Sequence, residues 1–379
     1  MEVMLVLVIL SEFDSEQLLL QKITSSLSSQ LASSFSSSHP FCQSSITLSQ
    51  PHNCSFASMA PQYNSHTTAS ELVSELASNI KGKVILTTGA SPTSLGAHFL
   101  KAVAVAEPSL LILTGRNVSK LQETADAITK INSNVKTRVL KLELSSLQSV
   151  REAAAEVLAW DDVPVIDVLV NNAGIMAVDY ALSPDGQELH FATNHLGHFV
   201  FTNLIMSKIL ASSEPRIVSV TSNGHRLSPV RFDSLDFDGG KDYNKWRAYG
   251  QSKTANILFA SSLAKKLGGK GLVAVSVHPG VIGTTGLGTH IKWDTEMADL
   301  IAADSSFGDA KGAFDFKTED EGVATHVFAS FHPSLREHNG AYLTDAHVAE
   351  PDRDWAKSET DAEKLWKLSE DLVGQQFIY

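Results

Sequence analysis

Tyr249 and Lys253 are two side chains whose types and spacing could carry out acid–base chemistry. They stand four residues apart in a stretch typical of a helix, so the phenol and the ammonium share one helical face. A phenol has an ordinary pKa of about 10, and a fixed cation nearby stabilises the phenolate and lowers that pKa. A single Tyr-x-x-x-Lys also arises by chance as an exposed helical pair. The surrounding sequence must therefore decide between a reactive pair and an ordinary one.

The elements that would position this pair alternate between strands and helices. Short apolar runs are typical of strands buried on both faces, and the stretches between them carry apolar residues at spacings of three and four. The expected strands are 84–86, 110–114, 139–144, 165–170, 217–220 and 273–277, and the expected helices include 118–131, 150–160 and 189–210. This alternation predicts an α/β fold with a doubly wound, Rossmann-type parallel sheet in a single domain. Ligands of such folds bind beyond the carboxyl ends of the strands.

The turn after the first strand contains two glycines, Gly89 and Gly96, before a helix that begins near Ala97. Gly89 would permit a tight turn, and Gly96 would let the helix pack closely on the strand with its N-terminus facing a pyrophosphate. The usual dinucleotide-binding loop has a third glycine between these two, where this chain has Thr93 and one residue more. A β-carbon there could crowd the phosphates. Two glycines alone are equally compatible with an ordinary loop.

The second strand ends in Gly115 and Arg116, where an enzyme that prefers NAD would have a carboxylate for the adenine ribose. A guanidinium at this position suits the 2′-phosphate of NADP, and Asn117 could assist it. The alternative is a surface arginine at the end of a strand. Glu143, after the third strand, is either a side chain that approaches the adenine or a solvated carboxylate.

Polar residues and glycines also follow the later strands. Ser222 could polarise a substrate oxygen, and Asn172 could tie neighbouring strand ends together beside a cofactor that approaches Gly174. Asn194, within the helix 189–210, is either functional or a solvent-side residue. Residues of the rigid turn after the last strand could hold a nicotinamide amide, namely Pro279, Gly280, Val281 and Thr284.

These motifs, in this order, resemble the short-chain dehydrogenase/reductase superfamily over about Lys81 to Gly374. Within it the chain is most similar to the retinol-dehydrogenase-like group, which includes the catalytic region of WW-domain oxidoreductases. The similarity is carried by Asn171-Asn172-Ala173-Gly174-Ile175-Met176, the Asp185-Gly186 turn with Glu188, Phe191 to Phe199, and Trp246 to Lys253.

The resemblance implies a role for each matched residue. Tyr249 would be the acid/base, and Lys253 would lower its pKa while binding the nicotinamide ribose. Ser222 would position the carbonyl oxygen, and Asn194 would hold a water that links Lys253 to solvent. A pKa lowered by two to three units needs roughly 3–4 kcal/mol, which a desolvated ammonium and an oxidised nicotinamide could supply. The expected NADP(H) contacts are Gly89, Ser91, Leu95, Gly96, Arg116, Asn117, Glu143, Asn172, Ala173, Gly174, Tyr249, Lys253, Pro279, Gly280, Val281 and Thr284.

Composition excludes several other classes of protein. The 379 residues contain 30 basic and 42 acidic side chains, a net charge of −12, so nucleic acid is a poor partner. The two cysteines, Cys42 and Cys54, lie near the N-terminus, which leaves the rest without a thiolate metal site and favours a reducing, cytoplasmic location. No histidine pair has the spacing of a zinc site, and no metal is expected.

The N-terminal region differs from the remainder. Its longest apolar run, 4–10, is too short to span a membrane, and 25–58 is serine-rich with almost no charge, which favours disorder. We therefore divide the chain into a disordered extension, 1–58, a lead-in, 59–80, and a Rossmann-type domain, 81–376. The extension could also result from a start codon set upstream of Met59.

The substrate wall is expected from three stretches, namely 226–247, 285–316 and the region after Asn223. They supply apolar residues that suit a hydrophobic aldehyde, ketone or alcohol, or that simply close the core: Phe232, Leu235, Phe237, Trp246, Leu287, Trp293, Met297 and Phe307. The stretch 365–373 is typical of a terminal amphipathic helix. A homodimer through the helices of Asn194 and Tyr249 is implied only by the resemblance.

Three functions compete on the sequence. The first is an NADP(H)-dependent carbonyl reductase or alcohol dehydrogenase. The second is a catalytically silent NADP(H)-binding sensor, against which the complete set of four catalytic residues argues and for which Thr93 argues weakly. The third is a sugar-nucleotide epimerase or dehydratase, which would need more than the roughly ninety residues that follow Thr284 for its substrate domain.

Overall fold

The computed structural model describes residues 63–308 and 315–379. The predicted disordered extension, 1–58, lies outside the described residues. So do residues 59–62 of the predicted lead-in and residues 309–314 of the second predicted substrate segment.

An eight-stranded sheet organises the described residues, in the order β3-β2-β1-β4-β5-β6-β7-β8. Neighbouring strands are parallel from β3 to β7, and β8 alone pairs antiparallel, with β7. The strands are β1 (Val84–Thr88), β2 (Leu110–Gly115), β3 (Lys136–Lys141), β4 (Val168–Asn171), β5 (Arg216–Val220), β6 (Val273–His278), β7 (Tyr342–Thr344) and β8 (His347–Ala349). The strand order reverses between β1 and β4, which confirms the doubly wound fold and marks the expected ligand crevice.

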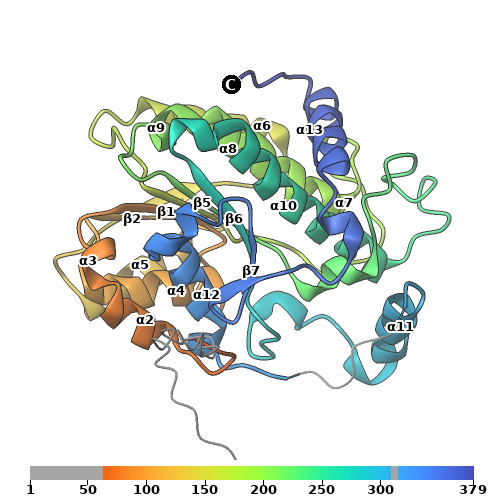
Figure 1. Ribbon diagram of the computed structural model, residues 1–379, viewed down its shortest axis with the longest axis horizontal. Coiled ribbons are helices and arrows are strands. Elements are labelled where there is room, and N and C mark those ends of the chain that lie inside the picture. Colours follow the sequence, from red (N-terminus) through yellow and green to blue (C-terminus); the bar gives the residue numbers. More distant parts are fainter. Residues whose placement is uncertain (1–62, 309–314) are drawn as a thin grey trace, which may run out of the picture. The chain divides into compact units, whose positions relative to one another are not determined.

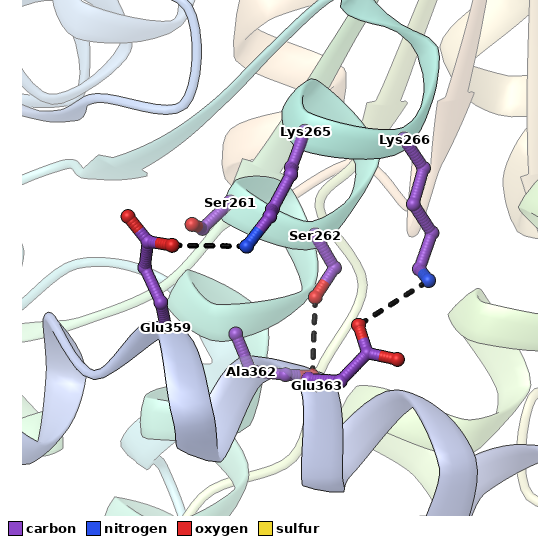
Figure 2. Close-up of a pocket in the computed structure, with 7 residues that line it drawn as sticks. All are labelled: Ser261, Ser262, Lys265, Lys266, Glu359, Ala362 and Glu363. Carbon is purple, nitrogen blue, oxygen red and sulfur yellow. Dashed lines mark hydrogen bonds and ion pairs between the residues drawn. The ribbon is translucent and has the colours of Figure 1, made fainter.

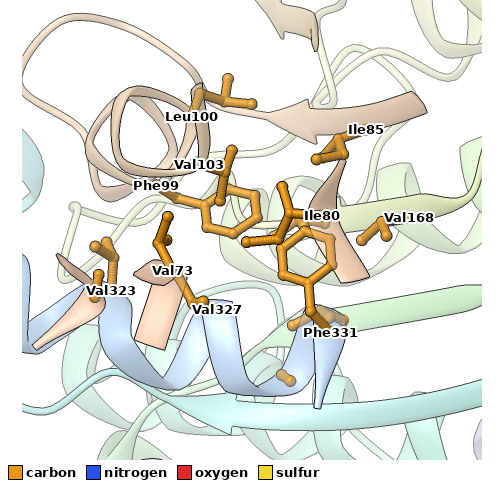
Figure 3. Close-up of a cluster of buried hydrophobic side chains, with 14 of the residues drawn as sticks. Val73, Ile80, Ile85, Phe99, Leu100, Val103, Val168, Val323, Val327 and Phe331 are labelled. Atoms are coloured by element: carbon orange, nitrogen blue, oxygen red, sulfur yellow. The ribbon is translucent and has the colours of Figure 1, made fainter. Parts of the chain in front are cut away.

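Helices cover both faces of this sheet, as Figure 1 shows. One face carries α2 (Ala69–Glu75), α4 (Leu95–Val103), α5 (Val118–Ile131) and α12 (Glu319–Phe331). The other carries α6 (Leu147–Ala159), α8 (Gly197–Leu204), α10 (Lys245–Leu267) and α13 (Glu359–Val373). Adjacent residues of a central strand serve opposite cores, since Ile85 packs with the first set and Leu86 with the second. Figure 3 shows Ile85 with Phe99 of α4 and Val327 of α12.

Shorter elements join the layers. The remaining helices are α3 (Ala77–Ile80), α7 (Leu189–Phe191), α9 (Met206–Leu210) and α11 (Trp293–Ser305). A π-helical turn, η2, spans Ala192–Leu196. The 3₁₀ turns are η1 (Ala104–Ala106), η3 (Asn223–Leu227), η4 (Gly268–Lys270), η5 (Gly286–Gly288), η6 (Pro333–Arg336) and η7 (Asp354–Ala356).

Most predicted elements are present with shifted bounds. The helix predicted at 118–131 matches α5, whereas α6 begins three residues before the predicted 150 because Ser146 caps it. β3 begins at Lys136 instead of 139, and β4 at Val168 instead of 165. The helix predicted over 189–210 is divided into α7, η2, α8 and α9. The terminal helix α13 begins six residues before the predicted 365.

His326, on α12, should make stability depend on pH. Its ring is fully buried near Phe99, with ring centroids 6.1 Å apart, and burial lowers its pKa to about 4. The unfolded value is about 6.5, so the unfolded chain takes up this proton first as the pH falls. The associated stability is complete above pH 6.5 and is lost toward pH 4, at about 1.4 kcal/mol per pH unit.

We therefore expect His326→Gln to flatten the pH dependence of unfolding. Urea unfolding measured at several values from about pH 6 to about 4.5 should show a slope smaller by about 1.4 kcal/mol per pH unit than the parent's. Identical slopes in the two proteins would show that the histidine titrates alike in the folded and unfolded chains.

Candidate active site

The predicted pair, Tyr249 and Lys253, lies together on α10. Asn244 caps this helix by accepting hydrogen bonds from the amides of Trp246 and Arg247, each at 3.0 Å. Tyr249 and Lys253 are both buried, and Lys253 Nζ lies 5.6 Å from the centre of the Tyr249 ring. The exposed helical pair that the sequence left open is therefore excluded.

Ser222 meets the tyrosine from the end of β5. Its side chain forms a hydrogen bond with Tyr249, and its Oγ accepts the amide of Gly224 at 3.0 Å. A β-carbon on Gly224 would lie 2.6 Å from Cε1 of Tyr249, so the turn after β5 can approach the phenol only as glycine. The serine, the phenol and the ammonium thus converge at the carboxyl edge of the sheet.

Burial sets the proton affinities of both groups. It raises the pKa of Tyr249 to about 12, opposed by the hydrogen bond from Ser222, and it lowers the pKa of Lys253 to about 8. In the chain by itself, desolvation outweighs the hydrogen bond from Ser222, so the phenol pKa is raised. The lowered pKa expected from the sequence included an oxidised nicotinamide and stays a prediction. The phenol is protonated at neutral pH and can act as an acid.

Asn194 lies in the π-helical turn and is fully buried. Its Oδ1 accepts the Ile175 amide at 2.8 Å, and its Nδ2 donates to the Ile175 carbonyl and to Ser252 Oγ, both at 2.9 Å. A β-carbon on Gly174 would lie 3.1 Å from Asn194 Oδ1 and 3.3 Å from Lys253 Nζ. The amide and the ammonium therefore face the same small space above Gly174, and the solvent-side alternative for Asn194 is wrong.

The glycine loop after β1 has the geometry that the sequence predicts. Gly89 has φ +71°, and a β-carbon there would lie 2.8 Å from Cα of Ala173. A β-carbon on Gly96 would lie 2.6 Å from the Gly89 carbonyl oxygen, so helix and strand need glycine to pack this closely. Thr93 is exposed and has no positive φ, so its side chain fits without strain.

Ser94 caps α4, a role that sequence reasoning missed. Its Oγ accepts the amide of Ala97 at 3.1 Å and lies 2.6 Å from the Gly89 carbonyl oxygen, to which it donates. The helix begins at Leu95, two residues before the predicted start. Serine directly before a helix is the preferred N-cap and could have identified this position.

A second missed group, Thr88 with His198, joins the ends of β1 and β4 to the turn that holds Asn194. His198 Nδ1 lies 3.0 Å from the Asn194 carbonyl oxygen, which only accepts, so Nδ1 carries the proton. Nε2 then accepts from the Thr88 hydroxyl at 2.8 Å, and burial lowers the pKa of His198 to about 4. Thr88 Oγ1 also accepts the amides of Asn172 and Ala173, each at 2.9 Å.

Asn172 ties the strand ends together as predicted. Its Nδ2 donates to the carbonyls of Thr88, at 2.8 Å, and Gly89, at 3.2 Å.

The expected adenosine side of the crevice is more exposed. The Arg116 side chain is 72% exposed, and its Nε lies 3.7 Å from Glu143 Oε2. Glu143 Oε1 accepts from the Ser145 amide at 3.2 Å, and Asn117 caps α5 by accepting the Lys120 amide at 3.1 Å. Arg116 is therefore free to turn from a weak ion pair toward an anion.

Lys317 packs against the turn that follows β6 and supports it. Gly280 has φ +90°, and a β-carbon there would lie 2.6 Å from Cδ of Lys317, whose Nζ pairs with Asp345. The Lys317 amide donates to the Val281 carbonyl at 2.9 Å, and Thr284 forms a hydrogen bond with Glu319. Sequence reasoning missed Lys317, which is distant in the chain from the turn it supports.

The predicted substrate residues divide into three groups. Trp246 is buried in a small apolar cluster with Ala177, Leu227, Ile291 and Ala303. By contrast, Phe237 is fully buried against Tyr243, and two others pack on the main core, namely Phe232 and Leu235. Three remain exposed on or near α11, namely Leu287, Trp293 and Phe307. For Phe232, Leu235 and Phe237, closing the core is thus the better interpretation.

A pocket between α10 and α13 lies apart from these residues. Figure 2 shows Lys265 paired with Glu359 at 2.9 Å and Lys266 with Glu363 at 3.4 Å across it. Together with the contact of Trp366 on Phe199, at 5.0 Å between ring centroids, these pairs fasten α13 over α10 and α8. The pocket serves helix packing and contains none of the predicted catalytic groups.

Within residues 63–308 and 315–379, no helix is long and apolar enough to cross a bilayer. The same residues contain no group of three histidine, cysteine or acidic side chains placed to hold a metal.

Known proteins are similar to this chain in sequence and in fold. A family model for short chain dehydrogenases matches residues 83–295. Human retinol dehydrogenase 11 is 35% identical over 301 residues, which cover 78% of this chain and 87% of that protein. The chloroplastic short-chain dehydrogenase TIC 32 B of Brassica napus is 36% identical over 271 residues, covering 69% and 80%.

Solved structures agree on the fold. An uncharacterised protein from Mycobacterium paratuberculosis has a TM-score of 0.59 and 29% identity, covering 80% of this chain and 98% of that chain. A short chain dehydrogenase from Shigella flexneri, complexed with NADP, has a TM-score of 0.53 and 19% identity, covering 70% and 98%.

Proposed function

The chain belongs to the short chain dehydrogenase family, in its retinol-dehydrogenase-like group, and from that premise we propose that it is an NADP(H)-dependent carbonyl reductase or alcohol dehydrogenase. Membership itself indicates an oxidoreductase acting on CH–OH and C=O groups with a nicotinamide cofactor. The choice of NADP(H) and of a hydrophobic aldehyde, ketone or alcohol is our proposal. The observation that supports it best is the convergence of Ser222, Tyr249 and Lys253 beside the glycine-lined crevice.

The residues at the crevice fit a dinucleotide. Gly89 and Gly96 let the first turn, Ala173 and α4 pack closely, and the N-terminus of α4 presents amides that suit a pyrophosphate. Lys253 and Asn194 face the space above Gly174. When bound, the nicotinamide would supply a hydride for reduction and accept one for alcohol oxidation.

Tyr249 would donate a proton to the carbonyl oxygen during reduction. Its raised pKa, about 12, keeps the phenol protonated at neutral pH, and Ser222 can share the same oxygen. Lys253 would stabilise the phenolate that remains. Its pKa, lowered to about 8, suits the return of a proton to the phenolate from the space that Lys253 shares with Asn194. In the oxidative direction the same phenolate would take the proton of the alcohol.

The proposal is tested by turnover. The purified chain should oxidise NADPH when given apolar aldehydes or ketones, and this is followed by the loss of NADPH absorbance. Tight NADPH binding without turnover on any member of a broad panel would favour the sensor instead.

Arg116 should select the phosphorylated cofactor. We expect Arg116→Ala to weaken NADPH about 30-fold, because a charge-assisted contact to the 2′-phosphate is lost, and to change NADH by less than about two-fold. Fluorescence titration with both cofactors measures this. Arg336→Ala is the matched control, since it removes another exposed arginine, which pairs with Glu214 just before β5 and away from the carboxyl edge of the sheet, and it should not weaken NADPH. Equal losses for both cofactors in Arg116→Ala would contradict the role of the guanidinium.

A cytoplasmic location and a homodimer complete the proposal. The position of both cysteines supports the first, and the chloroplastic relative supplies the alternative, which fractionation of cells would decide. The dimer is implied by the family alone, and sedimentation of the purified chain tests whether one forms although α13 covers part of α8 and α10.

A further inference from the structure

A buried carboxylate–imidazole pair, Glu188 and His190, lies directly behind the Tyr249 ring. The two side chains are fully buried, and His190 Nδ1 lies 2.8 Å from Glu188 Oε1. The His190 and Tyr249 rings meet edge to face, with centroids 6.3 Å apart and planes at 67°. None of the roles assigned above uses this pair.

The hydrogen bonds fix the tautomer of His190. Its Nε2 accepts the amide of Val178 at 3.3 Å, so that nitrogen has no proton, and the neutral ring carries its proton on Nδ1 toward Glu188. If Nε2 also carried a proton, its N–H would point at the amide N–H of Val178, and the hydrogen bond between them would be lost. Both ring nitrogens are therefore engaged, and the ring can neither flip nor rotate without losing a bond.

Glu188 is itself held firmly. Its Oε1 accepts the amide of His190 at 2.9 Å and its Oε2 accepts the amide of Phe191 at 2.8 Å, which caps α7. A buried carboxylate that accepts several N–H groups is compensated and stays in place.

Tyr243 joins the first predicted substrate segment, 226–247, to this pair. Its hydroxyl lies 3.0 Å from the Val178 carbonyl oxygen, 3.1 Å from His190 Nδ1 and 3.3 Å from Glu188 Oε1. The Tyr243 ring packs edge-on against Phe237, with centroids 5.4 Å apart. The position of His190 thus depends on how the substrate segment is seated.

We propose that the Glu188–His190 pair, held by Tyr243, is a positioning device that fixes the ring of Tyr249 for proton transfer. The tyrosine is bounded by His190 on one side and by Gly224 on another, so its hydroxyl is directed toward Ser222. Small displacements of a reacting group, about 1 Å, can cost about 100-fold in rate. This inference rests on the proposed function for its kinetic consequence, but the geometry itself can be tested without turnover.

The kinetic test uses two variants of graded severity. His190→Phe keeps a ring against Tyr249 but loses the hydrogen bonds of both ring nitrogens, and it should lower kcat about 30-fold with an NADPH dissociation constant within about two-fold of the parent's. Tyr243→Phe removes one hydroxyl and should lower kcat about four-fold. Tyr180→Phe is the matched control, because its ring packs on Tyr243, at 5.2 Å, outside the hydrogen bonds of the pair, and it should keep kcat.

The structural test follows Tyr249 directly. The chain has six tyrosines, so a protein labelled with ¹³C at tyrosine Cζ gives few signals, and the one absent from Tyr249→Phe is assigned. That signal should move in Tyr243→Phe and stay in place in Tyr180→Phe. These NMR signals do not depend on turnover. Failure of the positioning proposal can therefore be distinguished from failure of the proposed function.

Two results would overturn the inference. One is a Tyr249 signal that is unmoved in both His190→Phe and Tyr243→Phe. The other is a fall in kcat in these variants that comes with a comparable fold-loss of NADPH affinity and with a lower melting temperature. A purely structural defect would lower all three quantities together.

Discussion

Tyr249→Phe is expected to lower kcat for carbonyl reduction about 1,000-fold, or about 4 kcal/mol, and to leave NADPH affinity within about two-fold. The variant removes the proton donor and its hydrogen bond with Ser222, whereas the ring keeps its contacts with Gly224 and His190. The glycine loop and Lys253 are untouched, so cofactor binding should persist. Steady-state NADPH oxidation and fluorescence titration measure the two quantities separately.

Tyr342→Phe provides the matched control. Tyr342 is also a buried tyrosine, but it lies on β7 against His225, with ring centroids 5.5 Å apart, and outside the catalytic group. It should keep kcat within about two-fold, since no reacting proton is removed. If Tyr249→Phe reduced carbonyls at the parental rate, another group would have to supply the proton.

The pH dependence of reduction follows from the same phenol. Because the pKa of Tyr249 is about 12 in the chain by itself, its acid form is complete at neutral pH and declines only in strong alkali. Lys253, with a pKa of about 8, loses its charge first as the pH rises. We therefore expect kcat for reduction to fall above about pH 8, with the loss of the ammonium that stabilises the phenolate. A pH profile that stays flat to about pH 10 would contradict this order.

The juxtaposition of Tyr249 and Lys253 was predictable because it depends on one helical repeat. Four residues along α10 place Tyr249 and Lys253 on one face wherever the helix lies, and strand–helix alternation then brings Ser222 to the same edge. Local signals of this kind also predicted the turn at Gly89 and the close packing at Gly96.

Residues whose role depends on distant partners were not predictable. His198 contacts Thr88 although the two residues are 110 positions apart, and Lys317 supports a turn some thirty-five residues earlier in the chain. Residue spacing in the sequence carries no information about contacts of this kind. Asn194 was ambiguous because a helical wheel assumes α geometry, whereas η2 is π-helical and turns the side chain inward. β7 and β8 have three residues each and too short a pattern to detect.

The conformation of Thr93 shows that the loop itself needs no glycine at that position, and crowding of a phosphate by its β-carbon stays a prediction. Sequence reasoning placed it where the family has a glycine and expected a β-carbon to crowd the phosphates. The threonine is exposed, has no positive φ and lies beside the turn at Gly286, where a β-carbon would be 3.1 Å from its Oγ1. The glycine requirement falls instead on Gly89 and Gly96.

Gly96→Ala should therefore weaken cofactor binding strongly. The added β-carbon would lie 2.6 Å from the Gly89 carbonyl oxygen and 2.7 Å from Asn172 Nδ2, so α4 must move away from β1. That movement displaces the helix N-terminus expected to hold the pyrophosphate. We expect the NADPH dissociation constant to rise about 30-fold, or about 2 kcal/mol.

Gly269→Ala is the control for this experiment, because no atom lies within 4 Å of the β-carbon it would add. It should bind NADPH like the parent, whereas Gly96→Ala should bind weakly while its circular dichroism, measured well below its melting temperature, still shows a folded chain. Since Arg116 is unchanged, the preference for NADPH over NADH should survive in Gly96→Ala although both bind less tightly. A dissociation constant within about three-fold of the parent's would mean that α4 absorbs the methyl group without moving, and that its N-terminus does not hold the phosphates.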